Sequence, residues 1–322
     1  MTQQQIIVKP NRHNTVRKAE QLLNARYSLS QLAIKIITTV ISMISKDDED
    51  FKLYVLKVQD FKELTETKHK NPYKQLRDAC DELLNKKIEF DDGEDVGFML
   101  TRWIASAEYF AGAGEIEIEI SQKLRPLLLQ LKGNYLNYEL GNILALRSNY
   151  LIRLYELLKH EYNKVVRYKS NTTAVIHEIE IDWLRKQFKI PDSYLFKDIR
   201  INILDKAVKQ FAEHTDITVS WKVSRKRVKK VLAVEFTIRA NDKLAIHLKD
   251  LRTFIEYMRK NYVNQDIWIG QGMILSISPE GRIYDKKTAK EYDKNKAQRV
   301  WEKWYELAKE DKMPIFNQPT LF

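Results

Sequence analysis

The stretch that decides the fold runs from residue 194 to residue 238 and reads YLFKDIRINILDKAVKQFAEHTDITVSWKVSRKRVKKVLAVEFTI. In its first half, apolar residues recur at steps of three and four, which predicts an amphipathic helix over 196–211. The buried stripe of that helix comprises Phe196, Ile199, Ile203, Leu204, Ala207 and Phe211. The opposite face is polar and carries Asn202, Asp205, Lys206 and Lys209, with Lys197 at one edge and Arg200 near the apolar stripe.

Two strands of alternating polarity follow the helix, and the turn between them is strongly basic. One face collects Ile217, Val219, Trp221 and Val223 from the first strand and Leu232, Val234, Phe236 and Ile238 from the second. The basic residues, with no carboxylate among them, are Lys222, Arg225, Lys226, Arg227, Lys229 and Lys230. A helix that fits a major groove, followed by a hairpin that straddles phosphates, is the arrangement of a DNA-binding winged helix. The charge run alone fits a solvated hairpin tip equally well, and the neighbouring helix favours DNA.

Length and charge limit the classes of protein that fit. The 322 residues suffice for two or three domains, and Lys plus Arg outnumber Asp plus Glu by 55 to 44. The formal charge of +11 favours a polyanionic partner. The single cysteine, Cys80, excludes an internal disulfide framework, fits a reducing cytoplasm and has the helical spacing of a buried residue. No signal pattern opens the chain, and its most apolar run, 32–44, is short and contains Lys35, so we expect a cytoplasmic protein without a membrane partner.

The chain before this stretch predicts elements of the same kind. Residues 1–26 are basic with little periodicity, which indicates a partly disordered arm that either touches phosphate or is merely solvated. Helices are expected over 31–45, with Ser30 as the N-cap, from Pro72 onward, and over 148–162. Further expected elements are a strand at 53–58, a helical turn from Asp60, a hairpin that turns near 91–93 with strands at 98–103 and 115–120, apolar helical patches at 124–131 and 138–146, a strand at 176–181, and a short helix at 183–188 capped by Asp182.

The order of these elements indicates an internal duplication. Residues 28–120 and 147–239 each predict a helix, a strand, a short helix, a long helix and a hairpin. Asp60 before Phe61 and Asp182 before Trp183 mark corresponding points in the two halves. The hairpin of the first half is acidic and that of the second is basic, so we expect the second half to bind DNA strongly and the first to pair with another protomer.

No enzyme or metal pattern emerges from the sequence. None of the nine glycines belongs to a Gly-x-x-x-x-Gly-Lys phosphate loop, and no pair of histidines has the spacing that a rolling-circle nickase needs. Three carboxylates line one face of 115–120, but strict alternation explains them as the outer face of a half-buried strand. We therefore expect neither catalysis nor a cofactor nor a metal site.

Several motifs resemble those of the iteron-binding plasmid replication initiators, the bacterial Rep proteins with tandem winged helices. The most specific is the helix RSNYLIRLYELL at 147–158, which contains Arg153, Tyr155, Glu156, Leu157 and Leu158. The Asp-Trp-Leu turn at 182–184, Tyr194-x-Phe-Lys-Asp and the run ILDKA at 203–207 extend the resemblance over residues 25–240. It implies an α+β fold, binding to repeated origin sites as a monomer, and repression of the protein's own gene by a dimer formed through the first winged helix.

The sequence and the resemblance together divide the chain into five parts. These are a basic arm (1–26), a first winged helix for dimerisation and auxiliary DNA contact (27–141), a second for main DNA binding (142–241), an α+β module (242–313) and an extended tail (314–322). We expect an initiator that binds iterons in double-stranded DNA, promotes origin opening and recruits host replication proteins. The alternative is a dimeric transcription repressor, which a lone inverted repeat near the gene would favour over direct repeats. Expected DNA contacts are Lys197, Arg200, Asn202, Lys206 and Lys209 on the helix, the six basic hairpin residues, and Lys70, Lys74 and Arg77 in the first half.

The last five residues, QPTLF at 318–322, resemble the short peptide by which bacterial replication proteins hold the sliding clamp. Gln318 would hydrogen-bond at one end of a groove, and Leu321 with Phe322 would fill an apolar pocket. Pro319 departs from the leucine that is usual at its position. The alternative is that these apolar residues fold back onto the chain's own core.

Overall fold

The structure, a computed structural model, divides into two compact units, residues 1–241 and 242–322. The residues that it describes are 5–6, 10–65, 72–91, 97–169, 172–241, 251–261, 266–268, 274–278, 280–309 and 315–316. Gln318, Leu321, Phe322 and Lys70 lie outside them, so the expectations for these side chains stay predictions.

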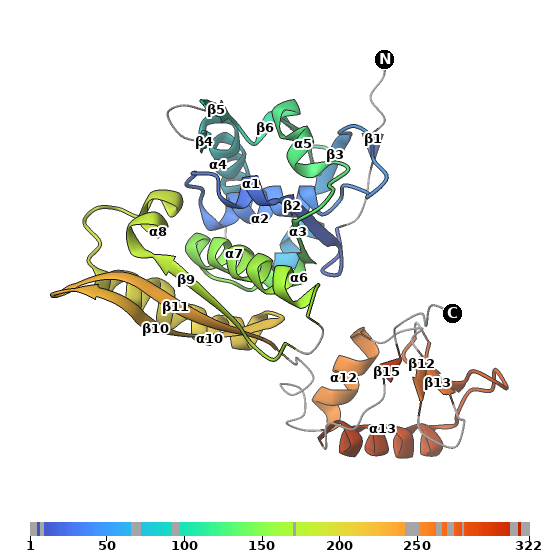
Figure 1. Cartoon of the computed structure of the whole chain (residues 1–322). Helices are drawn as coiled ribbons and strands as arrows, with labels where there is room; N and C mark the ends of the chain where they lie inside the picture. Colours follow the sequence, from blue (N-terminus) through green and yellow to red (C-terminus); the bar gives the residue numbers. More distant parts are fainter. Residues whose placement is uncertain are drawn as a thin grey trace. The chain divides into compact units, whose positions relative to one another are not determined.

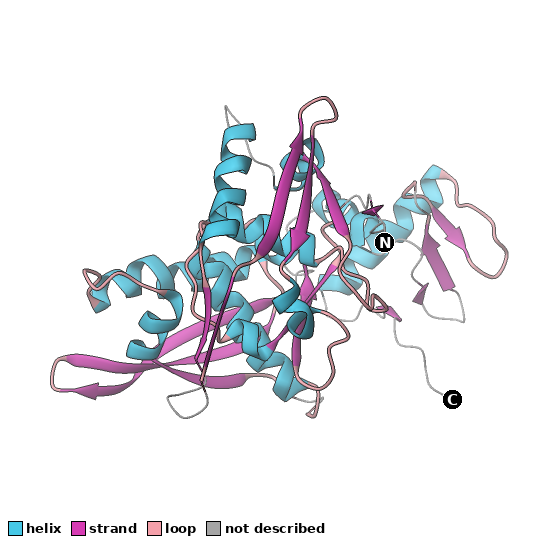
Figure 2. Ribbon diagram, turned by 90° about the horizontal axis from the view of Figure 1, so that it is seen from above, coloured by secondary structure: helices cyan, strands magenta, loops and turns pink. Residues whose placement is uncertain are grey.

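Unit 1 contains two successive winged helices that share one hydrophobic core (Figure 1). The first is built from α2 (Gln31–Ile41), β3 (Leu53–Lys57), α3 (Val58–Thr65), α4 (Pro72–Asn85), β6 (Ile104–Phe110) and β7 (Glu115–Ile120). The second is built from α7 (Asn149–Val166), β9 (Val175–Glu180), α8 (Ile181–Phe188), α9 (Phe196–Ile199), η2 (Arg200–Leu204), α10 (Asp205–His214), β10 (Ile217–Arg227) and β11 (Lys230–Ala240). Figure 2 shows that the long strands of unit 1 project beyond the helices that lie next to them.

Sheet topology supports the duplication more directly than sequence could. In the first half, β7 lies between β3 and β6, and in the second, β11 lies between β9 and β10. The strand before the short helix, and then the two arms of the hairpin, therefore occupy equivalent places in both sheets. The first sheet also gains β1 (Gln5–Ile6) beside β3.

The hairpin expected in the first half is two hairpins. β4 (Ile88–Asp91) pairs with β5 (Phe98–Thr101), while β6 pairs with β7. Positions 104–110 escaped the sequence prediction because β6 has one buried residue, Ile104, and no alternation to reveal it. In β7 the alternation is real: the isoleucines are buried and the glutamates half-buried, as expected.

Residues 15–26 are not a disordered arm. Thr15–Ala19 forms β2, which pairs with β8 (Tyr135–Glu139), and α1 (Glu20–Leu23) follows it. The expected helical patch at 138–146 is accordingly wrong in its first part, since Tyr138 is a strand residue and only α6 (Gly141–Leu144) is helical. The patch at 124–131 shortens to η1 (Gln122–Leu124) and α5 (Arg125–Leu128). Pairing between segments far apart in sequence overrides the local apolar pattern here.

The cap expected at Ser30 is confirmed, the structure adds one at Ser148, and the cap expected at Asp182 is absent. The Ser30 side chain accepts a hydrogen bond from the Ala33 amide, and Ser148 accepts one from the Tyr150 amide. The expected cap by Asp182 is wrong, because α8 begins two residues earlier, has Glu180 at its N-cap, and receives no side-chain cap. α2 ends at Ile41 rather than at residue 45.

The Arg-x-Tyr-Glu motif of α7 is a buried polar network. The Lys18 ammonium lies 2.6 Å from Glu156 Oε1, and both side chains are at most 3% exposed. Tyr138 donates its hydroxyl to the same Glu156 oxygen, and Lys18 also donates to Thr38 Oγ1 at 3.3 Å. Burial and the Glu156 carboxylate raise the pKa of Tyr138 well above its usual value, so this hydroxyl keeps its proton and remains a donor.

Arg153 joins three segments from within the core. Its Nη1 donates to the carbonyls of Tyr27, at 2.8 Å, and Gln187, at 2.7 Å, and its Nη2 donates to that of Ala25 at 2.7 Å. The guanidinium stacks 3.8 Å from the centre of the Tyr27 ring and 4.6 Å from that of Phe188. One side chain thus fixes α7, the end of α8 and residues 25–27 relative to each other.

Unit 2 is a smaller sheet with two helices. Its sheet has the order β14 (Ile283–Asp285), β13 (Ile274–Ile277), β12 (Asp266–Trp268) and β15 (Ile315–Phe316). α12 (Leu251–Asn261) and α13 (Lys294–Lys309) form its core together with the sheet, through Phe254, Met258, Trp301 and Trp304. The aromatic stripe of α13 is therefore core.

The Lys18–Glu156 pair yields a stability prediction. We expect Glu156→Leu to lower the free energy of unfolding by about 3–5 kcal/mol, because it leaves the Lys18 ammonium buried without a counter-charge. The double variant Lys18→Met, Glu156→Leu should recover a large part of that loss. Urea unfolding of the wild type and both variants measures both quantities, and a double variant no more stable than Glu156→Leu would contradict the pairing.

Candidate nucleic-acid interface

The helix at 196–214 bears the main cluster of exposed cations next to a hairpin. Its inward face is fully buried at Ile199, Ile203, Leu204, Ala207 and Phe211, as the apolar stripe predicts. The helix is interrupted by the π turn η2, which adds a residue to the helical repeat. That insertion turns Arg200 outward, although an ideal helix would place it near the apolar stripe.

The outward face of this helix is mostly charged. Lys197, Arg200, Lys206 and Lys209 are all exposed, and Asn202 is half-buried. Arg200 lies 3.8 Å from Asp205, and Lys206 donates to Asn202 Oδ1 at 3.3 Å. In the part of the chain that the structure describes, Lys197 and Lys209 form no ion pair. These two cations are free to meet phosphate.

Aromatic and polar contacts fix the helix beneath the hairpin. Phe211 packs edge-on against Tyr155, with ring centres 5.8 Å apart, and Phe196 packs against Trp221 at 6.4 Å. The Trp221 indole donates to Asp205 at 3.2 Å, and the Tyr155 hydroxyl donates to Asp216 at 2.8 Å. The charged face is thus held by a rigid support, which is what recognition of a groove requires.

The hairpin β10–β11 keeps the predicted alternation as far as Val223 and Val234. Beyond them the register shifts on both sides of Arg225, and Val231 rather than the expected Leu232 packs against the core. Trp221 faces Phe236 and Val223 faces Val234 on the buried side, and β9 extends the sheet beyond β11. The strands meet at Val228 and Lys229. Val228 has a φ of +54° and is 93% exposed, an unusual conformation for a β-branched residue. We call residues 222–230 the wing.

The six cations of the wing divide into two groups. Lys222 pairs with Glu235 at 2.9 Å, Lys230 with Asp182 at 3.0 Å, and Arg225 with Glu178 at 3.0 Å and Glu180 at 2.7 Å. Among the described residues, Lys226, Arg227 and Lys229 form no ion pair and are exposed. The sequence could not separate the groups, because most of these acids lie on β9 and α8, more than 40 residues upstream of the cations they neutralise.

In the first half, α4 offers a weaker basic surface. Lys74 and Arg77 are exposed on α4 and line a groove of about 530 Å³. Tyr73 and Tyr109 flank the groove with ring centres 5.4 Å apart. Cys80 also lines it but is buried, and burial raises the pKa of its thiol to about 11, which makes it unreactive at neutral pH.

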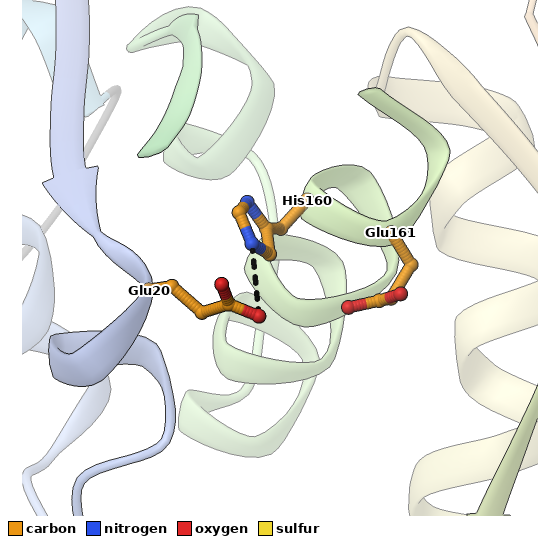
Figure 3. Close-up of side chains that lie close together, drawn as sticks. All are labelled: Glu20, His160 and Glu161. Carbon is orange, nitrogen blue, oxygen red and sulfur yellow. Dashed lines mark ion pairs between the residues drawn. The ribbon is translucent and has the colours of Figure 1, made fainter. Parts of the chain in front are cut away.

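A cluster of metal-ligand type lies apart from this surface. Glu20, His160 and Glu161 have ligand atoms within 4.8 Å of one another (Figure 3). The sequence analysis found no histidine pair and did not predict this cluster, because Glu20 lies in α1 whereas His160 and Glu161 lie in α7. Lys164 Nζ lies 3.2 Å from both Glu20 Oε1 and Glu161 Oε1, and His160 Nε2 lies 3.4 Å from Glu20. The ammonium thus neutralises both carboxylates, and the cluster is an ion-pair junction between α1 and α7.

Within the described residues, no helix is both long and apolar enough to cross a membrane.

Comparisons with known proteins bear on both halves of unit 1. A profile described as "Initiator Replication protein, WH1" matches residues 15–159, and one described as "Initiator Rep protein, WH2" matches residues 180–238. A solved structure of the Pi initiator protein in complex with iteron DNA matches with a TM-score of 0.57 at 17% identity, over 72% of this chain and 99% of that one. At this identity the match shows a shared fold.

A second structure is the WH1 domain of MSBI1.176, a replication protein isolated from a multiple sclerosis patient. Its match has a TM-score of 0.23 at 16% identity, over 32% of this chain and 74% of that one. The two family profiles together cover more than half of the chain. The protein therefore belongs to the family of replication initiator (Rep) proteins, with tandem WH1 and WH2 winged helices.

Proposed function

We propose that this Rep protein binds direct repeats of its origin, the iterons, as double-stranded DNA. The outward face of α9–α10 enters the major groove, and the wing lies along the adjacent phosphates. The observation that carries the proposal is the set of exposed cations without an internal counter-charge among the described residues: Lys197, Lys209, Lys226, Arg227 and Lys229. The fold shared with an initiator that was solved with iteron DNA supports the same assignment.

The two groups of wing cations give this proposal a matched test. Replacing Lys226, Arg227 and Lys229 by alanine should lower affinity for repeat DNA and flatten its salt dependence, since each phosphate that is no longer neutralised removes about 0.9 from the slope of log K against log salt. The control variant, Lys222→Ala with Lys230→Ala, removes paired cations and should change the slope less. Fluorescence anisotropy at several salt concentrations measures both. An unchanged slope in the triple variant would remove the wing from the interface.

Binding to repeats fits initiation of replication by local origin opening and recruitment of host replication proteins. In this proposal Lys74 and Arg77 on α4, together with Lys70 shortly before them in the sequence, add a second, weaker contact. A chain with two basic surfaces can engage more of each repeat than one winged helix alone.

We further propose that a dimer formed through WH1 represses the protein's own gene. Among the described strands, β6 forms an edge of its sheet, so its outer backbone groups are available to a second copy. Tyr109 and Phe110 on this strand are 40% and 42% exposed. Antiparallel pairing of two β6 strands would cover both side chains.

Analytical ultracentrifugation of the full chain tests the dimer. The wild type should show a concentration-dependent dimer, and Tyr109→Asp with Phe110→Asp should shift it toward monomer. Truncation after residue 145 is a poor test, because it removes Glu156 and leaves Lys18 buried without its partner. Leu195→Asp, at an exposed position outside β6, is the matched control. A wild type that stays monomeric at high micromolar concentration would contradict the dimer.

The tail resemblance extends the proposal to the sliding clamp. A peptide of residues 310–322 should bind purified clamp, and the same peptide with Leu321→Ala and Phe322→Ala should not, because the pair supplies the apolar anchor. Calorimetric titration of clamp with each peptide measures this. Equal binding by both peptides, or by neither, would end the clamp hypothesis.

A further inference from the structure

Two aliphatic side chains interrupt the charged outward face of α9–α10. Ile201 is 42% exposed and Val208 is 37% exposed. Ile201 lies between Lys197 and Lys209 in the sequence and, like both, is exposed. Val208 is exposed on α10, next to Lys209 in the sequence. Single exposed apolar residues are common on proteins, but these two stand among the exposed cations of α9–α10.

The core does not need these side chains. The inward face of the helix is already filled by Ile199, Ile203, Leu204, Ala207 and Phe211, each with 0% exposure. Ile201 belongs to the π turn η2, which spans Arg200–Leu204. π turns are rare and occur often at functional sites. The turn buries Ile203 and Leu204 side by side and leaves Ile201 facing outward.

The chemistry of the major groove supplies an apolar partner for them. Thymine presents its C5 methyl group there, and no other base of DNA does, so an aliphatic side chain that contacts this methyl distinguishes thymine. Lys197 and Lys209, on either side of Ile201, would hold the flanking phosphates and set the depth of the helix in the groove. Isoleucine and valine also have restricted χ1 in a helix and lose little conformational freedom when they bind.

We propose that Ile201 and Val208 read thymine in the bound repeat by contact with its C5 methyl group. This inference rests on the proposed function, because it requires that the outward face of α9–α10 enter the major groove. It adds a source of base specificity that the charged residues of the same face lack, since lysines on phosphate give affinity without sequence preference.

One chemical substitution in the DNA isolates the methyl group. Origin DNA amplified with deoxyuridine in place of thymidine keeps every base pair and removes only the C5 methyls. The wild type should bind uracil DNA more weakly, by about fourfold for each methyl group that the side chains contact. Ile201→Ala with Val208→Ala should bind thymine DNA more weakly than the wild type and should distinguish the two DNAs little. Both side chains are exposed, so the variant should fold, which circular dichroism checks.

Lys209→Ala is the matched control on the same face. It should weaken binding to both DNAs and keep the wild-type ratio between them. Equal wild-type affinity for thymine and uracil DNA would overturn the inference and leave repeat binding intact. A wild-type preference that the alanine variant retains would overturn it too, and would assign the preference to other residues or to DNA shape. Failure of the wild type to prefer repeats over random DNA would instead refute the proposed function.

An apolar protein partner is the competing occupant of these side chains. In that case the alanine variant would change the oligomeric state of the chain in ultracentrifugation and leave the ratio between thymine and uracil DNA unchanged. That result also overturns the thymine contact.

Discussion

The ammonium of Lys18 and the carboxylate of Glu156, 2.6 Å apart in the core, join segments that are 138 residues apart in sequence. A buried charge is tolerable only with a counter-charge and further hydrogen bonds, and here Thr38 and Tyr138 supply them. The pair therefore fixes β2 against α7, and with β2 the strand β8 that pairs with it. The two winged helices are thus joined through the core that they share.

Arg153 extends this dependence to the second winged helix. It ties α7 to the last turn of α8 and to the chain before α2, and α7 in turn supports α10 through Tyr155 and Phe211. The orientation of α10 thus depends on buried residues of α7. This explains in physical terms why the motif at 153–156 is the most specific part of the resemblance to Rep proteins: its polar groups position the two winged helices within one core.

Acidic side chains of the protein itself neutralise part of its basic surface. Acidic residues on β9, α8 and β11 form ion pairs with three of the six wing cations, and Asp205 lies 3.8 Å from Arg200. The charges left free form a smaller set on the wing and on one helix face. In the proposed complex with DNA, such neutralisation would limit nonspecific attraction to phosphate and give contacts to bases a larger share in recognition.

Elements whose burial imposes a local period were predictable from the sequence, whereas contacts between segments distant in sequence were not. The stripe from Phe196 to Phe211 and the alternation in β10 and β11 were predictable, because burial imposes its period on local sequence. Lys18 was assigned to a partly disordered basic arm, and the ion pairs of Arg225 could not be predicted, because their partners are distant in sequence. β6 escaped because an exposed edge strand imposes no pattern. The outward turn of Arg200 could not be foreseen, because a wheel drawn for a regular helix does not include the extra residue of a π turn.

The central claim is that WH2 docks on repeat DNA with its helix in the groove and its wing on the backbone. Photo-crosslinking from single positions on the full chain tests this most directly. A crosslinker at position 201 should label bases within a repeat, one at 229 should label the adjacent sugar-phosphate backbone, and one at 123, on η1 of WH1, should label neither. Labelling from 123 without labelling from 201 and 229 would contradict the account.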